Sequence, residues 1–267
     1  MSELETILQR INKNMTGLKT QSQQTSQKMN SKTSTFKCDL CQDTSWVPGE
    51  NGFERCKCFQ RELVERRWRR FGITPSKVKK INEYETRTEI TKLAKAKAVQ
   101  YIRNFNSIRS TDENSLAFLG QHGAGKSHLI IGIGAALVNG EDFISVVYMP
   151  YIEVMQELKA NAMDEENYLK IQSKYTTAEL LIVDDLFKDK VKKGVLIGEL
   201  KETDMKHIYP IINYRYINHL PTIYSSECDP DMLMDLDGAL AGRILEPSSV
   251  VVFEKCKEND YRLRKFI

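Results

Sequence analysis

The 267-residue sequence lacks any apolar run near the roughly 18 residues that a membrane-spanning helix requires. Its first residues, MSELETILQR, lack the basic stretch and following apolar stretch that begin a secretory signal. Neither sign of charge is in marked excess, because 39 Lys and Arg face 36 Asp and Glu, for a net charge of +3. Charge balance alone therefore does not indicate a nucleic-acid partner. These absences predict a cytoplasmic protein with no membrane partner.

The sequence also shows no internal repeat at a fixed period, so it does not indicate a repeat architecture. Hydrophobic residues make up 41% and charged residues 28%, which argues against wholesale disorder. The length suits one α/β domain of roughly 150 to 200 residues and a smaller appendage.

Three regions are expected along the chain. Residues 1–35 contain a short helix over 4–16, whose apolar face packs on its own domain or docks on another protein, followed by a polar linker. Residues 36–75 contain a cysteine-rich module and then a basic linker helix in FQRELVERRWRRFGI. Pro75 interrupts that helical pattern and sets the boundary to the third region, residues 76–267.

The third region alternates buried strands with helices. A helix is expected over 90–108, and the apolar strands are 116–120, 144–150, 180–186, 221–227 and 250–254. Such alternation predicts an α/β fold with a parallel sheet covered by helices on both faces.

A full-length phosphate-binding loop, GQHGAGKS, lies between the first of these strands and an apolar helical stretch. Its glycines let several backbone N–H groups converge on one phosphate, and the following helix N-terminus adds partial positive charge. The alternative, a chance Gly-rich turn, lacks this strand-and-helix context. We therefore expect ATP or ADP to be bound by Gly120, Gly123, Ala124, Gly125, Lys126, Ser127 and His128. Lys126 is expected to reach the β- and γ-phosphates, whereas His122 is interpreted as a variable loop position.

Two aspartates end the strand LLIVDDL. At the carboxyl end of a buried parallel strand, Asp184 is placed to bind magnesium together with the Ser127 hydroxyl. Asp185 is then placed to orient or deprotonate the attacking water. A strand-end turn or helix cap is the alternative, but the phosphate-binding loop upstream favours catalysis.

Four of the six cysteines form two close pairs separated by a turn-rich stretch: Cys38, Cys41, Cys56 and Cys58. This spacing is typical of a structural zinc site, with an iron–sulfur cluster or free thiols as the alternatives. Four thiolates leave no open position for catalysis at the metal. The distant Cys228 and Cys256 are interpreted as ordinary thiols.

The order of modules, together with GQHGAGKS and LLIVDDL, resembles the bacterial and phage helicase loaders of the DnaC/DnaI family. The resemblance covers nearly the whole chain and implies an AAA+ ATPase domain preceded by a small zinc module. It also implies that the zinc module binds the hexameric replicative helicase, that the ATPase domain binds single-stranded DNA, and that copies of the chain self-associate.

The resemblance further assigns roles by position. PTIYSSE matches the sensor-1 strand, where the family usually ends in Asn but this sequence has Glu227. That departure predicts slow or differently regulated hydrolysis. Arg243 matches the arginine finger, although spacing alone indicates a surface arginine. Arg262 and Arg264 match the family's Tyr-Arg tail or are solvated surface charges.

The function expected is therefore that of an ATP-dependent helicase loader in DNA replication. Two alternatives stay open at this point. One is a transposition helper ATPase of the IstB type, which has a similar ATPase module but does not explain the zinc module. The other is a helicase-binding adaptor with little ATP hydrolysis, which Glu227 keeps open.

Overall fold

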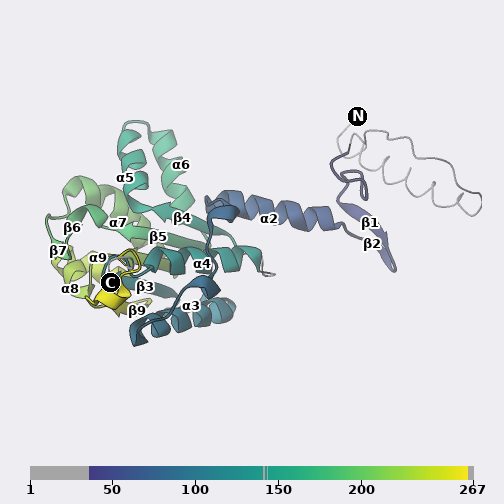
Figure 1. Ribbon diagram of the computed structural model, residues 1–267. Coiled ribbons are helices and arrows are strands. Elements are labelled where there is room, and N and C mark those ends of the chain that lie inside the picture. Colours follow the sequence, from purple (N-terminus) through teal and green to yellow (C-terminus); the bar gives the residue numbers. More distant parts are fainter. Residues whose placement is uncertain (1–35, 141, 143, 264–267) are drawn as a thin grey trace, which may run out of the picture. The chain divides into compact units, whose positions relative to one another are not determined.

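The computed structural model describes residues 36–140, 142 and 144–263 (Figure 1). The helix expected over 4–16, the polar linker and Arg264 lie outside these residues. The chain divides into two compact units, Met1–Glu65 and Arg66–Ile267. This division falls ten residues before the boundary expected near Pro75.

The described part of the first unit is built around a short antiparallel hairpin. Strand β1 (Trp46–Gly49) pairs with β2 (Gly52–Arg55), with Trp46 opposite Arg55. Gly52 has a φ of 131°, a conformation that glycine adopts without steric cost, and it allows the two-residue turn. Helix α2 (Lys57–Phe71) begins in this unit directly after Cys56.

The end of α2 belongs to the second unit. Arg67 donates to the backbone oxygens of Val138 (2.8 Å) and Gly140 (3.2 Å) at the C-terminal end of helix α4 (Lys126–Asn139), where the last carbonyls of a helix favour a cation. Phe71 is fully buried in the core of this unit. Arg67 and Phe71, near the end of the expected linker helix, are therefore buried in the second unit, whereas Arg69 and Arg70 between them are exposed.

The second unit contains a five-stranded parallel sheet in the order β4-β5-β8-β3-β9. The strands are β3 (Ser115–Gly120), β4 (Val146–Pro150), β5 (Leu180–Leu186), β8 (Thr222–Ser226) and β9 (Ser248–Phe253). All five expected strands are present, and the α/β class with a parallel sheet is confirmed. A small antiparallel pair, β6 (Val191–Lys192) and β7 (Val195–Leu196), was not expected.

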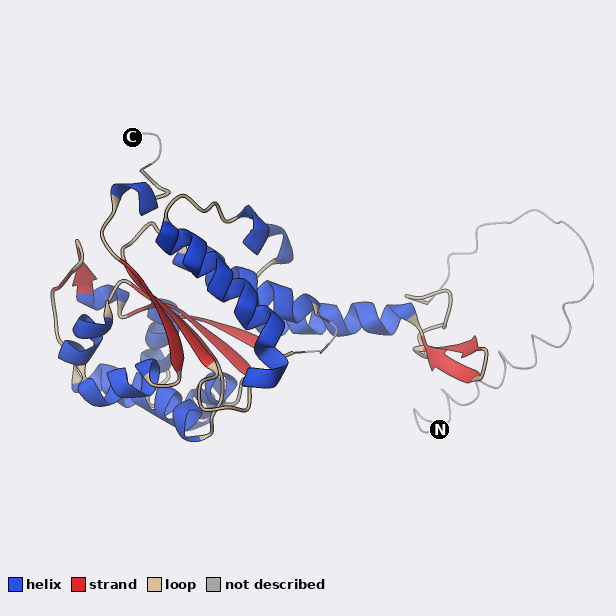
Figure 2. Cartoon of the chain, turned by 90° about the horizontal axis from the view of Figure 1, so that it is seen from below, coloured by secondary structure: helices blue, strands red, loops and turns tan. Residues whose placement is uncertain are grey.

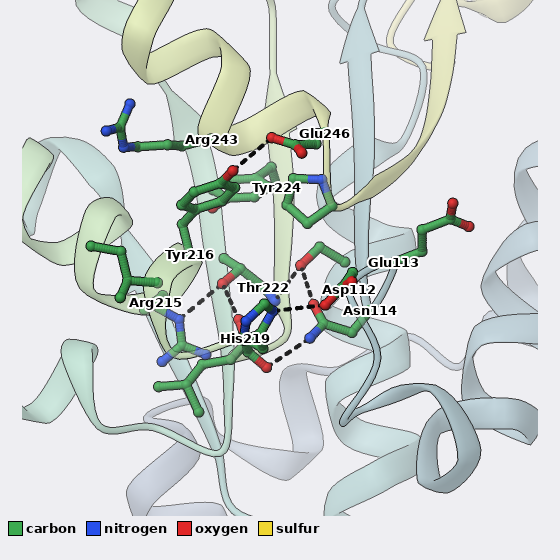
Figure 3. Close-up of a pocket in the computed structure, with 14 residues that line it drawn as sticks. Asp112, Glu113, Asn114, Arg215, Tyr216, His219, Thr222, Tyr224, Arg243 and Glu246 are labelled. Carbon is green, nitrogen blue, oxygen red and sulfur yellow. Dashed lines mark hydrogen bonds and ion pairs between the residues drawn. The ribbon is translucent and has the colours of Figure 1, made fainter.

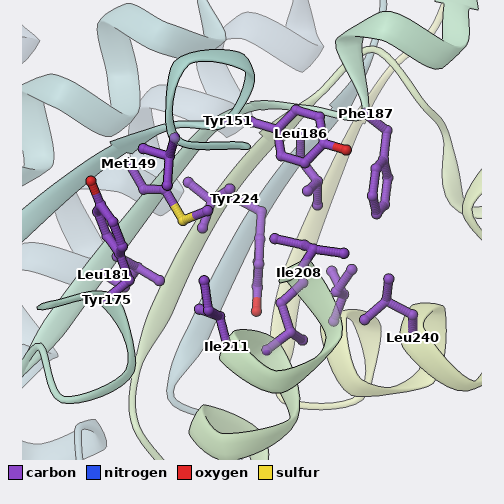
Figure 4. Close-up of a cluster of buried hydrophobic side chains, with 14 of the residues drawn as sticks. Met149, Tyr151, Tyr175, Leu181, Leu186, Phe187, Ile208, Ile211, Tyr224 and Leu240 are labelled. Carbon is purple, nitrogen blue, oxygen red and sulfur yellow. The ribbon is translucent and has the colours of Figure 1, made fainter. Parts of the chain in front are cut away.

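Helices cover both faces of the sheet (Figures 1 and 2). The end of α2, α3 (Glu89–Ile108) and α4 (Lys126–Asn139) bury one face. Side chains from β4, β5, β8, α7 (Glu202–Ile217) and α9 (Gly238–Leu245) meet on the other (Figure 4). That face is covered by α5 (Tyr151–Ala160), α6 (Glu165–Thr176), α7 (Glu202–Ile217), α8 (Pro230–Leu236) and α9 (Gly238–Leu245). Successive strand residues alternate between the faces, so both need apolar side chains.

The described residues of this unit also contain short 3-10 turns at Pro75–Lys77, Ile81–Glu83, Lys188–Lys190 and Lys257–Asn259. None of the helices in the described part of the chain is long and apolar enough to cross a membrane.

Candidate nucleotide and metal sites

The phosphate-binding loop connects β3 to α4 at the carboxyl edge of the sheet. Gly123 and Gly125 have φ values of 75° and 78°, the left-handed region that favours glycine. A Cβ atom at Gly123 would lie 2.2 Å from Asp260 Oδ1, and one at Gly125 would lie 2.7 Å from the Tyr84 ring. These positions therefore require glycine for space as well as for conformation.

Lys126 begins α4 and is 6% exposed. Its Nζ donates to the backbone oxygens of Gly120 (2.8 Å) and Gln121 (2.6 Å), so the ammonium group lies inside the curl of the loop. Burial lowers the pKa of Lys126 to about 8, because the surroundings disfavour its charge. An anion at this place would restore the preference for the charged form.

Asp184 holds the centre of a hydroxyl network at the end of β5. Its carboxylate accepts from Ser127 Oγ (2.8 Å), from Tyr148 OH (2.7 Å) and from Ser225 Oγ. Asp184 is 7% exposed, so these donors replace water for most of its oxygen lone pairs. Ser127 and Asp184 together offer the hard oxygen ligands that a magnesium ion takes, and they fit such an ion.

Asp185 adopts a φ of 53°, at an irregularity in the pairing of β5 with β8 between Val183 and Leu186. A non-glycine residue in this conformation costs of order 1–3 kcal/mol, and such strain is often found at functional sites. The backbone N–H of Asp185 donates to Ser225 Oγ (2.9 Å), which holds the conformation. Burial and the charge of Asp184 raise the pKa of Asp185, towards the range that a general base requires.

A cavity of about 490 Å³ opens over this loop. That size lies within the range of small-molecule sites. Most of the phosphate-binding loop lines the cavity, together with Asp185 and with side chains from the distant segments 79–85, 188, 227 and 261–262.

Residues near the C-terminal end of the described chain hold the loop from outside; we call residues 256–262 the C-terminal strap. Tyr261 N donates to Gly123 O (3.0 Å), and Gln121 exchanges two 2.8 Å hydrogen bonds with the backbone of Cys256. On another side Tyr84 OH donates to Ala124 O (2.9 Å). The backbone of the phosphate-binding loop is therefore supported by segments far from it in sequence.

His128, expected in the site, and His122, interpreted as a variable loop position, both line this cavity. His128 Nε2 lies 2.9 Å from Lys80 O, and its ring packs edge-on against Tyr84. His128 lines the cavity, and its role in nucleotide binding stays a prediction. His122 is half-exposed, and its Nε2 lies 3.7 Å from Asp260 Oδ2.

Arg243 lies elsewhere, on α9. Arg243 is not among the described residues that line the nucleotide cavity. Arg243 lines a separate cavity of about 350 Å³ (Figure 3). Its Nε donates to Asn213 Oδ1 (2.7 Å) and its Nη1 to Ala239 O (2.8 Å). An arginine finger that acts on a neighbouring subunit has to lie away from its own site, so the role of Arg243 stays a prediction.

Four sulfur atoms meet in the first unit. Cys38 and Cys56 have their Sγ atoms 3.8 Å apart, Cys41 and Cys58 have theirs 3.3 Å apart, and all four lie within 4.8 Å of one another. Zn–S bonds of about 2.3 Å in a tetrahedron require sulfur atoms about 3.8 Å apart. These residues therefore fit a zinc ion, and the cysteine cluster expected from the spacing is brought together.

Sequence reasoning did not find Tyr148, Lys188 or the C-terminal strap as parts of the site. Tyr148 could have been found, because β4 ends beside β5 and the carboxyl ends of parallel strands meet at one edge. Lys188 follows the two aspartates by three residues, but nothing in its neighbourhood in the sequence links it to Glu227. The strap had no signal beyond the resemblance in its Tyr-Arg pair.

Comparison with known proteins places this arrangement in a family. Residues 54–218 match the family described as IstB-like ATP binding protein. The chain is 35% identical to Bacillus subtilis YqaM over 72% of its own length, although it spans only 59% of that protein. It is 30% identical to the B. subtilis phage-like element PBSX protein XkdC, over 86% of this chain and 87% of that protein.

Solved structures show the same fold. The DnaC helicase loader superposes with a TM-score of 0.55 at 21% identity, covering 71% of this chain and 99% of that one. AMPPCP-bound DnaA from Aquifex aeolicus gives 0.54 at 19% identity, covering 72% and 56%. The DnaI structure gives 0.50 at 17% identity, covering 74% and 93%. The second unit thus has the AAA+ P-loop fold, and the expected likeness to DnaC and DnaI is confirmed for the fold.

Proposed function

The chain belongs to the family of IstB-like ATP binding proteins, and from this premise we propose that it is an ATPase that helps to place a hexameric replicative helicase on single-stranded DNA. The observation that supports ATP chemistry most directly is the convergence of Lys126, Ser127 and Asp184 at one edge of the sheet. A four-cysteine unit in front of that ATPase unit supports the loader role, because the transposition helper has no evident use for it.

Each residue of the site has a part in this proposal. Backbone N–H groups of the phosphate-binding loop and Lys126 bind the phosphates, and Ser127 and Asp184 hold magnesium, which neutralises phosphate charge when bound. Tyr148 and Ser225 fix the Asp184 carboxylate in position. Asp185 accepts the proton of the attacking water, and Arg243 of a neighbouring copy supplies positive charge to the transferring phosphate.

Two other functions have support from particular observations. The matched family description favours a transposition helper, which acts on a transposase and target DNA. Glu227, at the position of the usual sensor-1 Asn, favours an adaptor that binds nucleotide with little turnover. The partner distinguishes the loader from the helper, and the rate of turnover distinguishes the loader from the adaptor.

The deciding experiment is light scattering during size-exclusion chromatography of the full chain mixed with the replicative helicase of the same cell, with ATP and magnesium. A complex larger than the helicase hexamer is expected. If no complex formed with any nucleotide, the loader proposal would be overturned and the transposition helper would be favoured.

Two variants make this experiment sharper. Lys126→Ala removes the cation inside the phosphate-binding loop and is expected to abolish ATP binding; retained affinity would refute the assignment of the loop. Cys56→Ser with Cys58→Ser is expected to abolish the complex while ATP binding by the second unit persists. Loss of both properties would show that the cysteine unit supports the ATPase unit and does not specifically bind the helicase.

A further inference from the structure

Lys188 and Glu227 form an ion pair in the wall of the nucleotide cavity. Lys188 follows β5, just after Phe187 turns the chain with a φ of 59°. Glu227 follows the last residue of the neighbouring strand β8. The two side chains thus meet at the carboxyl edge of the sheet, beside Asp185.

A carboxylate is an unfavourable group at this place. Glu227 is a lining residue of the cavity, and only 11% of its side chain is exposed, so water screens its charge poorly. A triphosphate in the same cavity would bring further negative charge towards it. The charge of Glu227 is compensated by Lys188 and would oppose ATP if that compensation were lost.

Lys188 is able to change partners. Its side chain is 38% exposed, and a lysine ammonium is a compact charge on a flexible stem with three donors. Its charge also acts on the neighbouring groups, because it adds to the lowering of the pKa of Lys126 and opposes the rise in the pKa of Asp185. Lys188 therefore lies within electrostatic range of the lysine that binds the phosphates and of the proposed general base.

We propose that Lys188 exchanges Glu227 for the γ-phosphate of ATP, so that this ion pair discriminates ATP from ADP. In the ADP state Lys188 and Glu227 stay paired. In the ATP state Lys188 binds the third phosphate and Glu227 is left without its cation. The pair would thereby take over, with a different chemistry, the sensing that the missing Asn performs. This inference rests on the proposed ATP binding.

The test measures the affinities of the full chain for ADP and for the non-hydrolysable analogue AMPPCP, each with magnesium, by titration calorimetry. Lys188→Met is expected to weaken AMPPCP binding about ten- to a hundredfold, because a charge-assisted contact is lost. Its affinity for ADP is expected to change less than about twofold. Glu227→Gln removes the opposing charge and is expected to tighten AMPPCP binding, again with little change for ADP.

Lys192→Met is the matched control, because Lys192 is an exposed lysine on β6 that does not line the cavity. Its ratio of the two affinities is expected to equal that of the unaltered chain. Thermal melting of each variant checks the fold. If Lys188→Met does not fold, Glu227→Gln still tests the inference, because glutamine has nearly the same shape as glutamate.

Equal changes for both nucleotides, or an unchanged ratio in Glu227→Gln, would show that the pair is only structural and would overturn the inference. That result is distinct from failure of the proposed function itself. If the unaltered chain bound neither nucleotide, or if Lys126→Ala kept full affinity, ATP binding at this loop would be refuted.

Discussion

The two units of the chain reach stability by different means. In the second unit two clusters of buried apolar side chains enclose a five-stranded sheet, and the nucleotide site rests on its edge. In the described part of the first unit, Cys41 and Cys56 are the only buried residues, whereas Leu40, Trp46 and Phe53 are exposed. One unit is therefore expected to fold by hydrophobic burial and the other by metal binding.

This difference also separates what each site depends on. The candidate nucleotide site is built on strand ends that the apolar core already fixes, so its scaffold is expected to fold without nucleotide. The cysteine cluster is the core of its unit, and structural zinc contributes about 10–16 kcal/mol in small metal-dependent domains. Removal of the metal is therefore expected to unfold the first unit, whereas removal of the nucleotide is expected to leave the second unit folded.

The largest effect is expected for Cys56→Ser combined with Cys58→Ser. Zinc content should fall to zero and the first unit should lose its structure, while the melting transition of the second unit stays in place. Elemental analysis and calorimetry of the full chain measure these two results. Cys256→Ser is the control, because that thiol lies outside the cluster. An undiminished zinc content in the double variant would remove the proposed ligand set.

Asp185→Asn changes the chemistry of the second unit without touching its core. Loss of the proposed general base is expected to lower turnover about 10²- to 10⁴-fold, with ATP affinity nearly intact. Steady-state phosphate release and equilibrium binding measure the two quantities. Asp112→Asn, at a side chain that is 91% exposed, should leave both unchanged. Undiminished turnover in Asp185→Asn would exclude this residue from catalysis.

Phe71→Ala tests to which unit the end of α2 belongs. Because Phe71 is fully buried in the second unit, its truncation should destabilise that unit by about 3–5 kcal/mol. Denaturant titration, monitored by the loss of nucleotide binding, measures the unfolding transition of the second unit. Leu40→Ala, at a residue 74% exposed in the first unit, is the control and should leave the transition in place. A normal transition in Phe71→Ala would contradict the division between Glu65 and Arg66.

The smallest effect concerns pH. Lys126 has its pKa lowered to about 8, and bound phosphates favour its charged form. ATP affinity should therefore be greatest below pH 8 and should fall above it, by at most about tenfold per pH unit. Calorimetry in buffers of different ionisation enthalpy measures the proton uptake. Lys126→Arg stays charged to high pH, so the same pH dependence in that variant would assign it to another group.

Runs of apolar residues predicted the strands of the main sheet, although not all of their ends. The run LLIVDDL is β5 to the residue, since a continuous apolar stretch ending in charge has few other places in an α/β sheet. The strand expected from 144 begins at Val146, because the N–H of Ser145 donates to the Glu179 side chain (3.0 Å). The pair β6 and β7 is two residues long on each side, too short for periodicity to reveal.

The candidate site was predictable where one segment supplies it and obscure where several converge. The segment GQHGAGKS predicted the phosphate-binding loop, and the cysteine spacing predicted the cysteine cluster. The hydroxyl network on Asp184 instead joins residues 36 to 57 positions apart, and the contacts of the C-terminal strap span more than 130. Except for the contact of Tyr148, which lies on the parallel strand that precedes β5 in the chain, such contacts depend on a strand order that the alternation of strands and helices does not specify.

The C-terminal strap has a consequence for synthesis of the chain on the ribosome. Residues of the phosphate-binding loop emerge early, but their backbone partners in the strap are made more than 130 residues later. A nascent chain can complete its cysteine cluster as soon as Cys58 is free, since all four ligands lie within 21 consecutive residues, 38–58. The nucleotide site has to wait for the strap. During translation, therefore, all four residues of the cysteine cluster are available before the candidate nucleotide site has its last supporting segment.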